Sequence, residues 1–379
     1  LLQTHKMIKI IQSDKFIIFL LISFLLLTNN YYGEYNINTS ANSGFYYLHI
    51  ANSFPVGMTL ENSSQAYIHG ERFFVPYIVG FVSNLLDINS FYIFQAFTYF
   101  IISILVIINY KIINKVIPQK HYNLLFFSLF LLNPYILRYS LSNPLMLNDL
   151  VFTLSISLLF LSFLNKKNIL FYTSLFLAII SRQTSILIIL TLIFSLILPY
   201  KNEIINLKKI FFALLLWITN YFISQQYLEI SNITTFYESQ FFGLLDFFQK
   251  DFEILKFLKF LFLPFLSFGP LFVAIIFLFF KRKIFLRINE TNIFFIILLI
   301  LFAAQPFLCG PVVAGKNIIR LSTLGYTSII FVLCLNLKNL SDLSKKTFVI
   351  FSILLPFWSF HPTFSNIKIF EILKQFLNY

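Results

Sequence analysis

The stretch FYIFQAFTYFIISILVIINY, residues 91–110, decides the fold class. It contains no charged residue, and its apolar residues form a continuous run instead of alternating with polar ones. A helix needs about 20 predominantly apolar residues to cross the roughly 30 Å of hydrocarbon in a bilayer. Only helices and closed barrels satisfy every backbone polar group in lipid, and barrel strands alternate in hydrophobicity. The stretch therefore predicts a transmembrane helix.

Similar runs recur along the whole chain. Hydrophobic residues make up 58% of its 379 residues and charged residues 11%, against roughly 45–50% and about 25% in soluble domains. We therefore expect an all-α integral membrane protein, a single polytopic membrane domain over residues 1–379 with about eleven transmembrane helices. The expected spans are residues 16–28, 91–110, 122–137, 145–164, 169–181, 184–199, 210–224, 257–280, 292–308, 318–337 and 347–360.

Two apolar segments need a separate decision. Residues 16–28 follow three lysines, as in a signal peptide, but no small-residue cleavage site comes after them, so we expect a retained first span. Residues 73–86 are expected to form a re-entrant or interfacial helix. Counting them as a span would place the basic segment 110–121 on the opposite side from the other basic loops.

The distribution of basic residues predicts the topology. With the N-terminus in the cytoplasm, most of the 28 Lys and Arg residues fall in cytoplasmic segments, as the positive-inside rule requires. Topology thus accounts for the net charge of +13 and disfavours a nucleic-acid partner. The two long loops, residues 29–72 and 225–256, fall outside. Both are rich in aromatic residues, which is typical of helices that lie on the membrane surface.

A charged side chain at the end of a transmembrane span has a large free-energy cost, so its presence there indicates a function. On the predicted topology, arginines from four separate segments lie at the outer boundary. The planar guanidinium group keeps its charge and donates two parallel hydrogen bonds, which suits a lipid-linked phosphate. The alternative is that each arginine reaches lipid headgroups or pairs with Glu71 or Asp149. The candidate phosphate-binding residues are Arg72, Arg138, Arg182, Gln183, Asn317 and Arg320.

Two of these positions carry a further local signal. Ser181-Arg182-Gln183-Thr184 interrupts about 30 mainly apolar residues, which predicts two short helices joined by a polar hinge. Asn317 and Arg320 lie one helical turn apart at a predicted helix start, where backbone N–H groups also favour an anion.

A sugar leaving a phospholipid carrier needs electrostatic help at its phosphate, and the acceptor hydroxyl needs a carboxylate to take its proton. Glu34, Glu61 and Glu71 in the first outer loop are the candidates, and Glu34 and Glu71 are the predicted catalytic residues. His49 and His69 are either helpers or interfacial histidines. Cys309 and Cys334 show no CxxC spacing, so we expect buried, inert thiols.

Two segments of the first outer loop, SGFYYLHIA at residues 43–51 and GERFFVPY at residues 70–77, resemble the bacterial GT-C glycosyltransferases. Members of that family commonly carry Asp-Gly, a Tyr-Tyr pair and Ala, followed by Arg-x-x-x-Pro. The likeness covers roughly residues 16–110. This chain has Asn42 and Ser43 where the family has its acidic residue, so the base is expected at another position, such as Glu34.

The resemblance implies a glycosyltransferase that moves a hexose or pentose from a polyprenyl-phosphate sugar to an envelope glycan, lipid or protein acceptor. It also implies a loop carboxylate as base and a divalent metal ion as candidate cofactor. We expect the plasma (inner) membrane of a bacterium as the location.

Two other functions fit the same features. An O-antigen-type polysaccharide polymerase or ligase has outward arginines too, but its large loop usually falls late in the chain. A lipid-linked glycan transporter or flippase performs no covalent chemistry, and it would show inverted repeats or paired broken helices.

Overall fold

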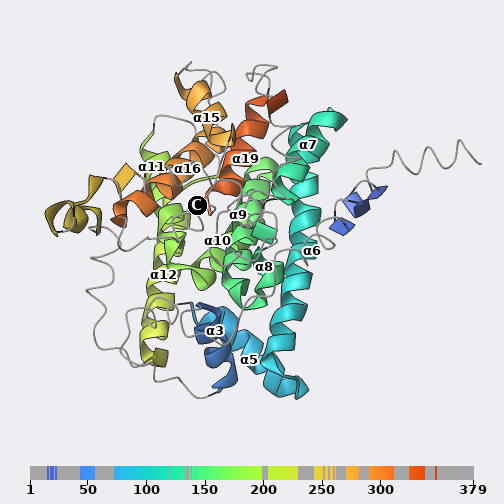
Figure 1. Ribbon diagram of the computed structural model, residues 1–379, viewed down its shortest axis with the longest axis vertical. Coiled ribbons are helices and arrows are strands. Elements are labelled where there is room, and N and C mark those ends of the chain that lie inside the picture. The colour runs from blue at the N-terminus through green and yellow to red at the C-terminus, as the bar shows by residue number, and fades with distance from the viewer. Residues whose placement is uncertain are drawn as a thin grey trace, which may run out of the picture.

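The computed structural model describes residues 43–55, 72–117, 119–131, 139–198, 204–228, 243–250, 270–280, 290–310 and 324–337, with a few single residues and short pieces between them. All named elements in this part of the chain are helices (Figure 1). In chain order they are α3 (Ser43–Asn52), α5 (Phe74–Leu86), α6 (Ser90–Val116), α7 (Lys120–Leu131), α8 (Tyr139–Ser142), η3 (Pro144–Met146), α9 (Leu147–Asn165), α10 (Asn168–Ser181), η4 (Gln183–Ser185), α11 (Ile186–Ile197), α12 (Leu207–Leu228), α15 (Pro270–Phe280), α16 (Glu290–Leu308) and α19 (Tyr326–Leu335).

Three helical segments are long and apolar enough to cross a membrane: Ser90–Val116, Pro144–Asn165 and Leu207–Ser224. The second is the most enclosed, with 78% of its apolar window buried against 33% and 22% for the other two. α9 is therefore the central helix, and α6 and α12 present large apolar surfaces outward. The expected class, a helical membrane protein, agrees with these elements. The count of eleven spans stays a prediction.

Helices α6 and α9 run in the same direction, since the start of one contacts the segment at the start of the other and their ends are also in contact. Near the start of each helix, Thr98 Oγ1 donates to the carbonyl of Pro144 at 3.4 Å. Near the end of each, Lys115 Nζ donates to Asn165 Oδ1 at 2.6 Å. At 1.5 Å per residue the 27 residues of α6 span about 40 Å. The two ends of the bundle are therefore far apart.

Loops that were predicted to share a side do lie together. At the far end of α9, Lys115 reaches Asn165, and Lys209 Nζ donates to Asn168 Oδ1 at 2.7 Å and lies 4.6 Å from the centre of the Phe171 ring. All of these residues belong to the predicted cytoplasmic loops or to helix ends beside them. The arginine cluster described below lies at the opposite end. Which end faces the cytoplasm remains a prediction.

Two predicted spans are longer than the helices found there. The span at 122–137 ends early, since α7 stops at Leu131 and Asn133 is not helical. Pro134 follows in the sequence, and a residue before proline is disfavoured in the α conformation. Within the span at 318–337, residues 324–325 form a turn and α19 begins at Tyr326, directly after Gly325, while residues 318–323 lie outside the described residues. Of the span 16–28, residues 16, 18–20 and 22–23 are described and are helical, and the span 347–360 lies outside the described residues except for residue 347.

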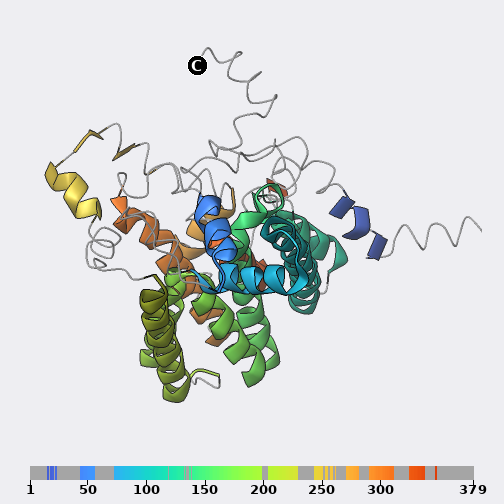
Figure 2. The same cartoon turned by 90° about the horizontal axis from the view of Figure 1, so that it is seen from below.

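Residues 73–86, expected as a re-entrant or interfacial helix, contain α5. Figures 1 and 2 show α5 running across the end of α6 instead of alongside it. The corner between them is made by Asp87 in the left-handed conformation, with φ of 54°. Ser90 Oγ donates to Ser83 Oγ at 3.0 Å across the same corner. This orientation fits a helix on the membrane surface, which stays a prediction.

Helix α3 packs closely on α5 at Gly80. A Cβ atom built on Gly80 would lie 2.3 Å from the carbonyl oxygen of Ala51 and 2.9 Å from Cβ of Phe54. Carbon and oxygen atoms do not approach so closely, so any side chain here would force α3 away from α5. Glycine at this position allows α3 to pack against α5.

Replacing Gly80 with Ala is therefore expected to destabilise the protein by about 1–3 kcal/mol, the usual cost of overpacking. Thermal unfolding in detergent, followed by circular dichroism, would measure the change. Leu85→Ala is the matched control, because Leu85 is 69% exposed on the same helix. An unfolding midpoint that is the same for Gly80→Ala and wild type would contradict the close packing of α3 on α5.

Candidate anion-binding site

The candidate site is built around a break between two helices. α10 ends at Ser181, and Arg182 has extended backbone angles, φ −154° and ψ 141°, before η4 begins at Gln183. The N–H of Arg182 makes the last helical bond, to the carbonyl of Ala178 at 3.1 Å. The break predicted at residues 181–184 is confirmed. It turns the Arg182 side chain into the bundle, where only 1% of the residue is exposed.

Arg182 forms an ion pair with Asp149, which lies in the first turn of α9. The aspartate side chain is 12% exposed. Removing two charges from water is costly, and their attraction offsets this cost only when the geometry is good. Pairing with Asp149, one of the alternatives for the outer arginines, is thus confirmed for Arg182.

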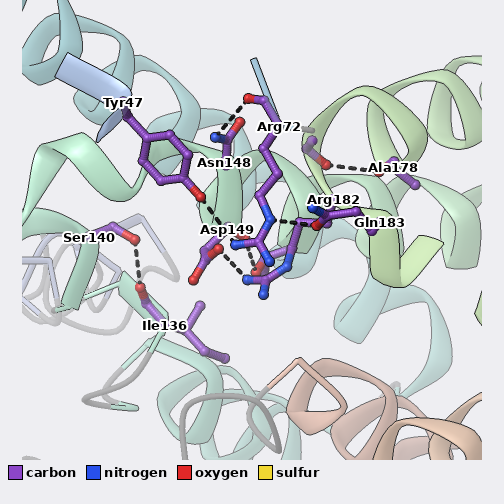
Figure 3. A network of polar contacts seen from close by, with 11 residues as sticks. Tyr47, Arg72, Ile136, Ser140, Asn148, Asp149, Ala178, Arg182 and Gln183 are labelled. Carbon is purple, nitrogen blue, oxygen red and sulfur yellow. Dashed lines mark hydrogen bonds and ion pairs between the residues drawn. The ribbon is translucent and has the colours of Figure 1, made fainter. Parts of the chain in front are cut away.

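Arg72 lies just before α5 and is 6% exposed. Its Nε donates to Gln183 Oε1 at 2.6 Å and its Nη1 donates to the hydroxyl of Tyr47 at 3.1 Å. Its backbone oxygen accepts from Asn148 Nδ2 at 3.2 Å. Figure 3 shows the side chains of α3, α9 and η4 meeting around this guanidinium group. Arg72 therefore joins the first predicted outer loop to the ends of the central helices.

The charges in this cluster do not balance. Within the described part of the chain, the partners of the Arg72 guanidinium are neutral, and no described carboxylate is in an ion pair with it. Among the described residues, Asp149 is the carboxylate that pairs with these two buried guanidinium groups, through Arg182. An uncompensated buried charge is unfavourable, and a bound anion would compensate it. The arrangement is suited chemically to a phosphate group.

The structure brings three of the predicted phosphate-binding residues together: Arg72, Arg182 and Gln183. Gln183 contributes by accepting a hydrogen bond from Arg72, so it orients the arginine in the structure. The remaining predicted site residues lie outside the described residues, and their roles stay predictions: Glu34, Glu71, Arg138, Asn317 and Arg320.

Two partners of Arg72 were not predicted as site residues, although signals for both are present in the sequence. Tyr47 follows Gly44 by three residues, which places the two on one face of a helix. Asn148 is a polar residue at the start of a long apolar run, and such residues in membrane segments usually serve a function. What the sequence could not indicate is that both face Arg72.

The described residues hold no cluster of three or more His, Cys, Asp or Glu side chains that could bind a metal ion. A divalent metal ion therefore remains a prediction that depends on residues outside this part of the chain, such as Glu34 and Glu71. Cys309 and Cys334 are both buried and neither is in a disulfide bond, and Cys309 Sγ accepts a hydrogen bond from Gln305 Nε2 at 3.3 Å.

Comparison of the chain with models of protein families, with curated proteins and with solved structures found no match.

Proposed function

We propose that this chain is a membrane glycosyltransferase that moves a sugar from a polyprenyl-phosphate carrier to an envelope glycan, lipid or protein acceptor on the outer face of a bacterial plasma membrane. The observation that carries the proposal is the buried cluster of Arg72 and Arg182, in which Arg182 pairs with Asp149 while the described partners of the Arg72 guanidinium are neutral. The cluster includes Tyr47 and Arg72, which belong to the two segments that resemble GT-C glycosyltransferases.

In the proposed reaction the guanidinium groups bind the carrier phosphate. The acceptor oxygen bonds to the anomeric carbon of the sugar as the bond between that carbon and the carrier phosphate breaks, and negative charge develops on the departing phosphate. Fixed cationic donors in a water-poor site stabilise such charge far more than they would in water. Glu34 or Glu71 takes the proton of the acceptor hydroxyl, and Arg138, Asn317 and Arg320 complete the phosphate site.

The place of the cluster in the chain favours this function over the two alternatives. Arg72 and Tyr47 come from the first predicted outer loop, whereas O-antigen-type polymerases and ligases usually carry their large loop late. The broken helix at Arg182 would need a counterpart in a transporter built from inverted repeats. A second break among the described residues lies at Asn143, between α8 and η3, and it carries an asparagine instead of an arginine.

A lipid analysis tests the proposed function. The protein is purified with native lipids, and co-purified polyprenyl phosphates are identified by mass spectrometry. Arg72→Gln is the variant of choice because the partners described for Arg72 are neutral, so no described carboxylate loses its ion-pair partner. We expect wild type to retain the carrier and Arg72→Gln to retain about tenfold less, the equivalent of ~1.4 kcal/mol of binding free energy.

Lys115→Gln is the control, since it removes a positive charge from the opposite end of the bundle and should leave carrier retention unchanged. If wild type retains bulk phospholipid but no isoprenoid phosphate, the proposed function is wrong. The transporter would then be tested by lipid translocation without sugar release.

A further inference from the structure

One buried amide beside the arginine cluster is unused by any contact described so far. Asn143 lies between α8 and η3 and is 1% exposed. Its backbone is satisfied, because its N–H donates to Tyr139 O at 2.9 Å and its carbonyl accepts from Met146 at 3.0 Å. In the described part of the chain, neither atom of its side-chain amide has a hydrogen-bond partner.

A buried asparagine whose side-chain amide makes no hydrogen bond is unusual among the described residues of this protein. Other buried asparagines with an unpartnered oxygen keep a bond through their amide nitrogen, as Asn123 does to Ile117 O and Asn336 does to Asn292 Oδ1. Asn143 also does not use its side chain to cap η3. A buried polar group that makes no bond lowers stability, and native proteins rarely keep one without a water, an ion or a ligand to bind.

The position of Asn143 links it to the arginine cluster through α3. A Cβ atom built on Gly44 would lie 3.4 Å from Asn143 Oδ1 and 2.8 Å from Cβ of Leu145, so α3 crosses the segment that leads into α9 at close range. Tyr47, one turn further along α3, bonds to Arg72. Asn143 and Arg72 therefore lie along the same side of α3.

A second buried amide, Asn148, lies in the arginine cluster itself, five residues after Asn143 in the sequence. Asn148 is 1% exposed and uses its Nδ2 to bond the backbone oxygen of Arg72, while its Oδ1 has no hydrogen-bond partner in the described chain. Ser185 in η4, two residues after Gln183, is also 1% exposed, and its hydroxyl has no partner among the described residues. Figure 3 shows Asn148 beside Arg72 and Tyr47, with Asp149 and Arg182 next to them. Neutral polar groups thus flank a cationic centre.

We propose that Asn143 and Asn148 form a hydroxyl-binding subsite that holds the sugar of a polyprenyl-phosphate sugar while Arg72 and Arg182 hold its phosphate. An amide offers donors and an acceptor side by side, and a sugar hydroxyl is both donor and acceptor, so the two match. A phosphate accepts only and is served better by guanidinium groups. This subsite rests on the proposed function, whose anion site it extends.

The subsite has a consequence for selectivity. A site with buried groups that must hydrogen-bond a hydroxyl rejects a ligand that lacks it, because those groups are then left unpaired. The protein should therefore discriminate between a carrier with a sugar and the bare carrier phosphate, and the discrimination should depend on Asn143.

The test compares two lipid probes on the full-length protein in nanodiscs. The probes are undecaprenyl phosphate and a panel of undecaprenyl-phosphate sugars carrying glucose, mannose, galactose or arabinose, and affinity is measured by native mass spectrometry. We expect wild type to bind at least one glycosylated carrier about tenfold or more tightly than the bare carrier. In Asn143→Leu this ratio should fall to about one while the affinity for undecaprenyl phosphate is unchanged.

Leucine branches at Cγ as asparagine does and removes the unbonded amide, but it is larger, so thermal unfolding of Asn143→Leu is measured beside its binding. Asn143→Ala, which cannot collide with Gly44, should show the same loss of preference if the leucine variant fails to fold. Asn123→Leu, a buried amide at the opposite end of the bundle, is the control and should keep the wild-type preference.

The remaining outcomes contradict either the hydroxyl-binding subsite alone or the subsite together with the proposed function. If wild type binds bare and glycosylated carriers equally, or if the preference survives in both Asn143 variants, the hydroxyl-binding subsite is wrong while the anion site stands. If wild type binds neither undecaprenyl phosphate nor any glycosylated carrier, the proposed function fails as well.

Discussion

Replacing Asp149 with Asn is expected to destabilise the protein by about 3–5 kcal/mol, the largest effect on stability among the described residues. Arg182 is 1% exposed and pairs with Asp149. Asparagine keeps the shape of the side chain but removes the negative charge, so it leaves a buried guanidinium group without a counter-charge. Thermal and chemical unfolding in detergent micelles would measure the change.

A double variant separates charge from packing. Arg182→Met combined with Asp149→Leu removes both charges and fills a similar volume, and replacing a whole buried pair with apolar residues is often neutral or stabilising. We therefore expect the double variant to recover most of the stability that Asp149→Asn loses. The exposed pair of Asp246 and Lys250, at 3.5 Å, provides the control. Asp246→Asn should cost less than about 0.5 kcal/mol.

A loss in Asp149→Asn as small as that in Asp246→Asn would mean that Arg182 reaches water or another anion when Asp149 is absent. Such a result would contradict the buried pair and would weaken the charge imbalance on which the anion site depends.

Two features of the fold could be predicted from the positions of charged residues in the sequence alone. Arg182 cannot continue an apolar helix through a membrane without a partner, and the helix does break there. The positive-inside rule assigned the loops of Lys115 and Lys209 to the same side, and the structure places both residues at the same end of α9. In both cases the charge of the residues in one segment was sufficient for the prediction.

The local rules failed where a helix end depends on a neighbouring turn. Hydropathy extended the span at 122–137 through Asn133, although the proline that follows makes a helix end there favourable. Mean hydropathy also extended the predicted span at 318–337 across Gly325, which lies in a turn. Hydropathy registers how apolar a segment is, and it does not register the backbone angles at its ends.

The composition of the site could be predicted only in part, because its contacts join distant segments. Arg72 meets Tyr47 from 25 residues away and Gln183 from 111 residues away. Whether a polar residue of an apolar helix faces a neighbour or lipid depends on how the helices are rotated, which a single sequence does not specify. Asn143 illustrates this limit, since nothing around it in the sequence distinguishes it from the many other asparagines of the chain.

The largest expected effect on activity is at Glu71. If Glu71 takes the proton of the acceptor, Glu71→Gln should lower kcat about 10²- to 10⁴-fold, the usual contribution of a general base. Glu71 directly precedes Arg72 in the sequence, and the guanidinium and backbone of Arg72 both make hydrogen bonds in the cluster. No such constraint ties Glu34 to the site, which makes Glu71 the better of the two candidates.

The assay is the release of radiolabelled sugar from a synthetic polyprenyl-phosphate sugar, with carrier binding measured in parallel. Glutamine keeps the size of glutamate but cannot accept a proton, so Glu71→Gln should lose turnover while it binds the carrier as wild type does. Glu34→Gln is the comparison, because it alters the other predicted carboxylate. If Glu34→Gln loses turnover and Glu71→Gln keeps it, the base belongs to the segment that follows the first predicted span, and the proximity of Glu71 to Arg72 serves binding alone.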